Sequence, residues 1–256
     1  MAQRILNFNQ HYNSKKLILS LDISTYCNAG CPQCHRTDTN GLAKASWLPL
    51  IQWTIQDFKD TYSIDSLKNI NQVEFCGTWG DPIMVKDIFK ITEYILNSSD
   101  ANILFNTNGS IRNHDWWWNF GLLGGKRITI VWAVDGSTQE IHSKYRQNTD
   151  LELIMENMQS FTSAGGHSQV FTVVFKHNQF NLYDIANLAK KNGASGISFV
   201  QSNRFRSDEP IFNFIDTKGQ KDYLEKTTLN DDMGFWKNLD YLDLNNEEDM
   251  IKIKMI

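Results

Sequence analysis

Short apolar runs alternate with amphipathic segments along most of this chain. The runs that predict β-strands cover residues 17–23, 72–76, 102–106, 128–134, 169–175 and 196–201. Most are continuous rather than strictly alternating, which is typical of strands buried on both faces of a parallel sheet. The pattern therefore predicts a parallel sheet with helices packed against it.

Three of the segments between these runs carry apolar residues at helical spacing. The predicted apolar faces consist of Val85, Ile88, Phe89, Ile95 and Leu96, of Leu151, Ile154, Met155, Met158 and Phe161, and of Leu182, Ile185, Ala186 and Ala189. Glycines at 165–166 and 193 predict where the last two helices end. Six β-then-α units in succession imply right-handed crossovers and a curved parallel sheet.

This organisation predicts the α/β class, as an incomplete (β/α)6 TIM-like barrel over residues 17–203. A full eight-stranded barrel needs two more units, and the chain after Ser202 supplies no clear one. Residues 1–16 form an N-terminal extension and residues 204–256 a C-terminal extension. The C-terminal extension is too aromatic for a disordered tail, so we expect it to pack over the open side of the barrel and cover a substrate cavity. Its aromatic residues include Phe212, Phe214, Tyr223, Phe235 and Trp236.

Composition narrows the functional class. The chain has 256 residues and a net charge of −4, so it has no electrostatic footprint for nucleic acid. No apolar run approaches the roughly 18 residues of a membrane span, and no secretory h-region follows Met1. Three of the four cysteines are clustered, which disfavours a disulfide scaffold. We therefore expect a cytoplasmic protein.

The clustered cysteines, Cys27, Cys31 and Cys34, follow the first predicted strand in a C-x3-C-x2-C pattern. Three thiolates on one loop can converge on one metal centre, and they leave a cubane iron–sulfur cluster one iron short of full protein ligation. An open iron can bind and activate a ligand. The fourth cysteine, Cys76, is expected to be a small buried hydrophobe.

Other interpretations of the same residues stay open. Residues 31–35 fit the C-x-x-C-H pattern of covalent haem attachment, which normally occurs outside the cytoplasm. A dithiol pair of Cys31 and Cys34 leaves Cys27 unexplained. A structural Cys3His zinc site would add His35, although such sites usually draw ligands from two separated pairs. The interpretation that all three cysteines are ordinary buried core residues is disfavoured, because the motif also contains Asn28, Gly30 and Pro32, which predict a turn.

The cysteine spacing and its position resemble the radical SAM superfamily, whose members bind S-adenosylmethionine (SAM) on the fourth iron. Residues 77–82, Gly-Thr-Trp-Gly-Asp-Pro, are similar to the Gly-Gly-Glu-Pro segment of that family, with Trp79 and Asp81 as departures. Residues 106–109, Asn-Thr-Asn-Gly, and residues 135–136, Asp-Gly, resemble strand ends of its molybdopterin-biosynthesis and peptide-modifying (SPASM) branch. The auxiliary-cluster cysteines of that branch are absent from the tail, and Ala133 stands where the branch often has serine.

The resemblance implies a radical SAM enzyme with a [4Fe-4S] cluster on the three loop cysteines. SAM would be reductively cleaved to a 5′-deoxyadenosyl radical, which abstracts hydrogen from an unidentified peptide or small-metabolite substrate. An electron donor such as flavodoxin or ferredoxin is the implied partner. The alternative is a non-catalytic Cys3His zinc-binding or dithiol redox domain. The expected SAM contacts are Gly77, Thr78, Trp79, Gly80, Asp81, Asn106, Thr107, Asp135, Gln169 and Gln201.

Three further expectations concern conspicuous residues. At least one of the tryptophans 116–118 is expected to pack in the core. His142 and residues 144–146 are expected on a charged, solvated helix face. A side chain added at Gly80 is expected to crowd SAM without touching the cysteine loop.

Overall fold

The computed structural model describes residues 17–206, 208–229 and 236–238. Its main sheet has the order β1-β2-β3-β4-β5-β6-β9, in which the first six strands pair in parallel. The strands are β1 (Leu17–Leu21), β2 (Ile70–Phe75), β3 (Asn102–Thr107), β4 (Ile128–Ala133), β5 (His167–Val174), β6 (Gly196–Gln201) and β9 (Trp236–Asn238). β9 pairs antiparallel with β6 and was not predicted. The sheet is open, so the predicted incomplete barrel is confirmed.

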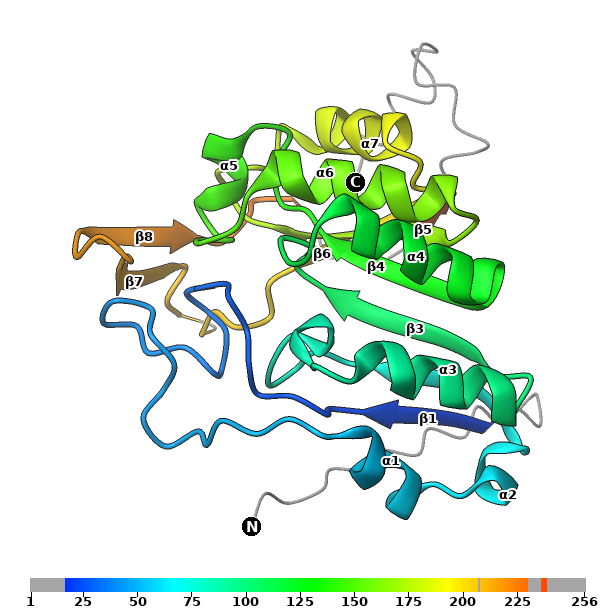
Figure 1. Cartoon of the computed structure of the whole chain (residues 1–256). Coiled ribbons are helices and arrows are strands. Elements are labelled where there is room, and N and C mark those ends of the chain that lie inside the picture. Colours follow the sequence, from blue (N-terminus) through cyan, green and yellow to red (C-terminus); the bar gives the residue numbers. More distant parts are fainter. Residues whose placement is uncertain (1–16, 207, 230–235, 239–256) are drawn as a thin grey trace.

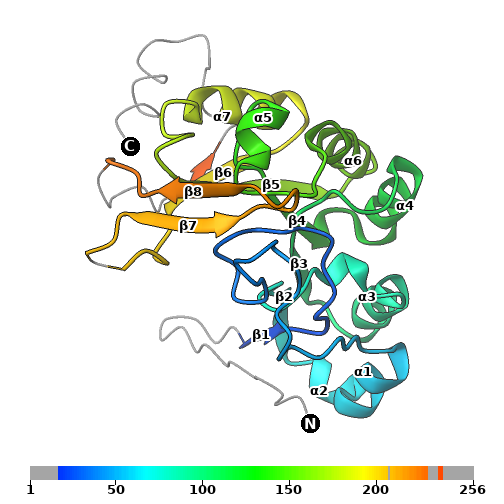
Figure 2. The ribbon, with the colours of Figure 1, turned by 90° about the vertical axis from the view of Figure 1, so that its left-hand side faces the viewer.

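Helices cover the outer face of this curved sheet. In Figures 1 and 2, α1, α3, α4, α6 and α7 form a layer on one side of the strands. The helices are α1 (Ile55–Thr61), α2 (Ile64–Leu67), α3 (Ile88–Ser98), α4 (His114–Gly124), α5 (Gln139–Ser143), α6 (Leu151–Ser163) and α7 (Leu182–Lys191), with short 3-10 turns at Pro82–Met84 and Gly125–Arg127. The three predicted apolar helix faces all lie in, or pack against, the main core.

Alternation along the strands separates this core from the inner face of the sheet. Val73 and Phe75 of β2 are fully buried in the main core. Glu74 lies between them and therefore points to the opposite, inner face. The same alternation in β4 buries Trp132 in the core and turns Val131 and Ala133 inward. The inner face is thus where side chains can meet a ligand.

Local signals explain where several helices begin and end. Asn113 and Asp150 cap α4 and α6 through side-chain oxygens that accept backbone N–H groups of Trp116 and Leu153. Gly165, with a φ of +100°, follows the end of α6 as predicted. Trp117 on α4 is fully buried whereas Trp118 is 43% exposed, which confirms that this tryptophan run contributes to the core.

Part of the C-terminal extension forms a hairpin of β7 (Ile211–Ile215) and β8 (Lys221–Glu225). Figure 2 shows it in front of the carboxyl ends of the central strands. Phe214 and Leu224 pack in a second apolar cluster with Ala29 and Cys31, so the hairpin contacts the cysteine loop. Phe235 and the side chain of Trp236, which were predicted to belong to this cover, lie outside the described residues, as does the predicted N-terminal extension at residues 1–16. Within the described part, no helix is long and apolar enough to cross a membrane.

Candidate functional site

The three clustered cysteines lie on the loop that follows β1. All three are free thiols and line one cavity of about 340 Å³. The loop is held at Gly30, whose N–H donates to the carbonyl of Gln147 at 2.9 Å. The cavity is also lined by residues near the carboxyl ends of β2, β3 and β4, which is where parallel α/β barrels build their sites.

Burial keeps the Cys27 and Cys31 thiols protonated when no metal is bound. It raises the pKa of Cys27 to about 12, with a smaller contribution from the Asp81 carboxylate. Burial also raises the pKa of Cys31 to about 11, while the positive charge of Arg146 opposes the shift. The Arg146 guanidinium lies 3.7 Å from the Cys31 sulfur. Metal binding must therefore displace protons from this loop.

The arrangement of these side chains bears on which kind of metal group they could hold. No group of three or more His, Cys, Asp or Glu side chains in the described part is placed to hold one ion. His35 is exposed and its ring contacts Trp79, with centroids 6.4 Å apart. A Cys3His zinc site is therefore not formed. Three thiols around a shared cavity fit a cubane, in which each thiolate binds a different iron.

The turn after β2 forms the opposite wall of the cavity through Gly77, Gly80 and Asp81. Gly77 has a φ of +68°, and a Cβ there would lie 2.8 Å from the Asn106 carbonyl oxygen. A Cβ on Gly80 would lie 2.6 Å from the Ser24 carbonyl oxygen and from the Thr25 carbonyl carbon. The expectation that a Gly80 side chain would spare the cysteine loop is therefore wrong, because Ser24 and Thr25 lead directly into it.

Asp81 connects this turn to the end of β3. Its buried carboxylate accepts hydrogen bonds from the Ile83 N–H at 3.0 Å, the Thr107 hydroxyl at 2.8 Å and the Asn108 N–H at 2.9 Å. Burial raises the pKa of Asp81 to about 6 despite these donors. The residue therefore fixes the relative position of two cavity walls.

Asn108 extends the same network to the cysteine loop. Its amide nitrogen donates to Asp81 at 2.6 Å and to the Asn28 side chain at 2.8 Å, and it lies 3.8 Å from the Cys27 sulfur. The loop, the β2 turn and the β3 end are thus one hydrogen-bonded unit. Asn106 and Thr107 also line the cavity, as predicted for ligand-facing residues.

Two of the predicted SAM contacts, Thr78 and Trp79, do not line the cavity. Their backbone N–H groups donate to the Asp22 carboxylate at 2.7 and 3.4 Å. The Trp79 ring packs edge-on against Trp47, with centroids 5.7 Å apart. Trp79, which departs from the glycine of the Gly-Gly-Glu-Pro pattern, is tolerated because its side chain does not line the cavity.

Asp135 also lies behind the cavity rather than in it. Its fully buried carboxylate pairs with Arg146 and accepts the Val173 N–H at 2.6 Å. Arg146 in turn lines the cavity. The expectation of a solvated helix face at His142 and residues 144–146 is therefore wrong for Arg146, and also for His142 and Tyr145, which are buried. Burial lowers the pKa of His142 to about 3, so its ring is neutral.

The two predicted glutamines lie outside the cavity lining. Gln169 is the third residue of β5, near the amino end of that strand and away from the edge that carries the site. Gln201 ends β6, but its amide donates to the Leu229 carbonyl. Ala133 does line the cavity and offers no side-chain hydrogen bond.

Several lining residues were missed as site residues. The cavity is also lined by Arg36, Glu74, Cys76, Asn108, Val131 and Phe171. The alternation of β2 could have identified Glu74 and Cys76, and Asn108 belongs to the strand-end motif already recognised. Arg36 carried no recognisable signal. Burial raises the pKa of Cys76 to about 12, helped by the Glu74 charge.

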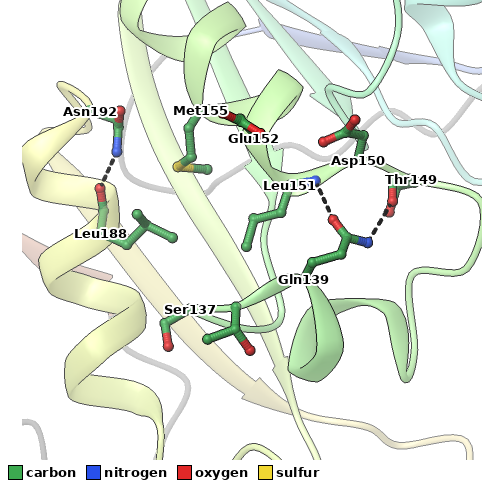
Figure 3. A pocket seen from close by; sticks show the side chains of 10 residues that line it. Ser137, Gln139, Thr149, Asp150, Leu151, Glu152, Met155, Leu188 and Asn192 are labelled. Carbon is green, nitrogen blue, oxygen red and sulfur yellow. Dashed lines mark hydrogen bonds between the residues drawn. The ribbon is translucent and has the colours of Figure 1, made fainter.

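A second, more open cavity of about 620 Å³ lies on the helical side of the fold. Figure 3 shows that Gln139 is already satisfied there, with hydrogen bonds to the Thr149 carbonyl and the Leu151 N–H. Asn192 similarly donates to Leu188. No cysteine, histidine or basic residue lines this cavity, so the chemistry is concentrated in the first one.

Neither a protein-family model nor a curated protein matches this sequence. Solved structures do match the fold. One is SuiB of Streptococcus suis bound to the precursor peptide SuiA, at 15% identity and a TM-score of 0.56, covering 73% of this chain and 39% of SuiB. A second is anSMEcpe with bound AdoMet, at 16% identity and a TM-score of 0.56, covering 72% of this chain and 50% of the other.

The third is TYW1 with a lysine-pyruvate adduct, at 8% identity and a TM-score of 0.53, covering 81% of this chain and 79% of TYW1. At such identities the likeness establishes the fold. The chain therefore has the same incomplete α/β barrel fold as these structures, and the fold predicted from the sequence is confirmed. It spans half or less of the length of SuiB and anSMEcpe.

Proposed function

We propose that this chain is a radical SAM enzyme that binds a [4Fe-4S] cluster through Cys27, Cys31 and Cys34 and cleaves SAM at that cluster. The observation that carries the proposal is the position of these three free thiols, which share one cavity with the Gly77–Asp81 turn at the carboxyl end of a parallel barrel. The likeness to AdoMet-bound anSMEcpe supports the same assignment.

When bound, the cluster would supply the electron that cleaves the SAM sulfonium to methionine and a 5′-deoxyadenosyl radical. The chain itself would hold and orient the reactants. Backbone carbonyls of the glycine turn can accept an ammonium group, and Asn106 and Thr107 present polar side chains beside it. This proposal gives no direct role to the predicted contacts that do not line the cavity, which are Thr78, Trp79, Asp135, Gln169 and Gln201.

Water exclusion is the second contribution of the chain. The β7–β8 hairpin packs Phe214 and Leu224 against the cysteine-loop cluster, and an ion pair between Lys144 and Asp222 ties it to the segment after α5. A reactive radical needs such a covered site. We propose that residues 204–256 act as a cover of the substrate cavity.

For the substrate we propose a peptide, because SuiB was solved with its precursor peptide and anSMEcpe with peptides. A low-potential donor such as flavodoxin or ferredoxin would supply the electron. The test is to reconstitute the protein anaerobically, reduce it with dithionite, and analyse SAM products by chromatography. We expect slow formation of 5′-deoxyadenosine and methionine without substrate. Methylthioadenosine or S-adenosylhomocysteine as sole product would contradict the proposal.

A further inference from the structure

One edge of the β7–β8 hairpin is attached to the barrel. β8 is held at the end of β5, where the Lys176 N–H donates to the Glu225 carbonyl at 3.0 Å. Figure 2 shows β7 on the other side of the hairpin from β5. The outer edge of β7 is paired at its carboxyl end, where the Ile215 N–H donates to the Thr39 carbonyl at 2.8 Å and the Ile215 carbonyl accepts the Gly41 N–H at 3.0 Å.

The hydrogen-bond register of the hairpin leaves the rest of that outer edge unpaired. Next to the turn, the Asp216 N–H donates to the Gln220 carbonyl at 2.8 Å. Bonded positions alternate in an antiparallel ladder, so the even-numbered residues of β7 bond to β8. The N–H and C=O groups of Ile211 and Asn213 therefore point outward. Within the described residues, no hydrogen bond reaches these four backbone groups.

β7 lacks the features that usually protect a free strand edge. Natural edge strands often carry a charged side chain, a proline or a bulge that prevents another strand from pairing. The sequence of β7 is Ile-Phe-Asn-Phe-Ile, its pairing with β8 is regular, and Pro210 precedes the strand. Ile211 is 47% exposed, and Tyr223, the cross-strand neighbour of Asn213, is 50% exposed. Such an edge can accept a further strand, as it already does at Ile215.

The position of this edge indicates which partner it would serve. Phe212 and Phe214, on the other face of β7, pack in the apolar cluster that contains Cys31. A strand added to the outer edge would lie about 4.8 Å from β7. It would share that edge with residues 39–41, which follow the cysteine loop in the chain. An extended chain bound there would therefore run beside the cysteine loop.

We infer that the free edge of β7 binds the peptide substrate as an added strand. The N–H groups of Ile211 and Asn213 donate to the peptide backbone, and their carbonyls accept from it. In this mode of recognition the main-chain bonds supply affinity, and side chains at alternate positions supply specificity. The exposed Ile211 and Tyr223 favour apolar side chains at those alternate positions. The inference rests on the proposed function, which takes a peptide as substrate, and adds how this chain holds it.

The test uses phage-displayed random 12-residue peptides as the probe. Peptides are selected on reconstituted wild-type protein after depletion on Asn213→Pro, and the Kd of each selected peptide is measured for wild type, Asn213→Pro and Asn213→Ala. Proline removes an N–H that the hairpin itself does not use, whereas alanine keeps it. We expect Asn213→Pro to raise the Kd by about tenfold, and Asn213→Ala, the matched control, by less than about threefold.

A second measurement does not depend on how well the proline variant folds. A selected peptide is N-methylated at one residue at a time, and each version is titrated against wild-type protein. Only every second residue of an added strand directs its N–H toward β7, so N-methylation should weaken binding at alternate residues of the paired stretch. Hydrogen exchange of the Ile211 and Asn213 amides should also slow when the peptide binds.

The inference would be overturned if no peptide distinguishes wild type from Asn213→Pro, or if N-methylation weakens binding without alternation. A wild-type dimer that Asn213→Pro dissociates would also overturn it, because a second copy of the chain would then occupy the edge. Slow SAM cleavage by wild-type protein without any peptide tests the proposed function separately, so the two failures are distinguishable.

Discussion

A single methyl group at Gly80 should disturb the cysteine loop. In Gly80→Ala the new Cβ would lie 2.6 Å from the Ser24 carbonyl oxygen and from the Thr25 carbonyl carbon. An ordinary contact is about 3.4 Å, so one backbone segment must move by roughly 0.8 Å. Both neighbours are backbone atoms, which cannot rotate away as a side-chain tip could.

The cost should therefore fall at the upper end of the range for overpacking, about 3 kcal/mol of the free energy of unfolding. For a chain of this length that corresponds to a fall of roughly 6–12 °C in Tm. Ser24 and Thr25 lead into Cys27, so movement of this segment should also shift the cysteine thiols from their positions around the cavity. We expect iron bound after anaerobic reconstitution to fall together with the Tm.

Thermal unfolding followed by circular dichroism, with iron counted on the same preparations, measures both effects. Gly219→Asn is the matched control: Gly219 lies in the hairpin turn with a φ of +81° and open space around it, and asparagine tolerates that conformation. The control should keep its iron and nearly all its stability. A Gly80→Ala protein with wild-type Tm and a full iron load would refute the close approach of the two segments.

Two further predictions concern buried residues. The pKa of Asp81 is raised from 3.8 to about 6, so its contribution to stability is fully present below pH 4 and is lost as the pH rises through 6. In urea titrations, the unfolding free energy of wild type minus that of Asp81→Asn should therefore fall by about 3 kcal/mol between pH 4 and pH 7. A difference that does not change with pH would contradict the burial argument. Trp117→Ala should cost about 3–5 kcal/mol of unfolding free energy, whereas Trp118→Ala, which removes a 43% exposed ring, should cost less than about 1 kcal/mol; equal losses would show that α4 is oriented differently.

The strands and the larger helices could be predicted because their signals are local. Most of the six predicted strands were continuous apolar runs, and the faces of α3, α6 and α7 were periodic. The hairpin of β7 and β8 was missed although its sequence alternates and its turn contains Gly219. Its aromatic residues indicated packing against the barrel, and two of them, Phe212 and Phe214, do pack in the cysteine-loop cluster.

The site was predictable where a motif places a residue directly on the cavity. The cysteines, Gly77, Gly80 and Asp81 satisfy that condition. Arg146 did not satisfy it, because its position depends on an ion pair with the buried Asp135, which the sequence pattern does not reveal. The same holds for Gly80 and Thr25, whose contact joins two segments about 55 residues apart in the chain.

The most direct test of the central claim is the iron content of the four single Cys→Ala proteins after anaerobic reconstitution. All four cysteines line the same cavity, but only three belong to the loop, so the comparison separates cluster ligands from a neighbouring thiol. We predict that Cys27→Ala, Cys31→Ala and Cys34→Ala each lose the cluster and its visible absorption, while Cys76→Ala keeps both. A normal iron load in Cys27→Ala, or a colourless wild-type protein that binds zinc instead, would contradict the account.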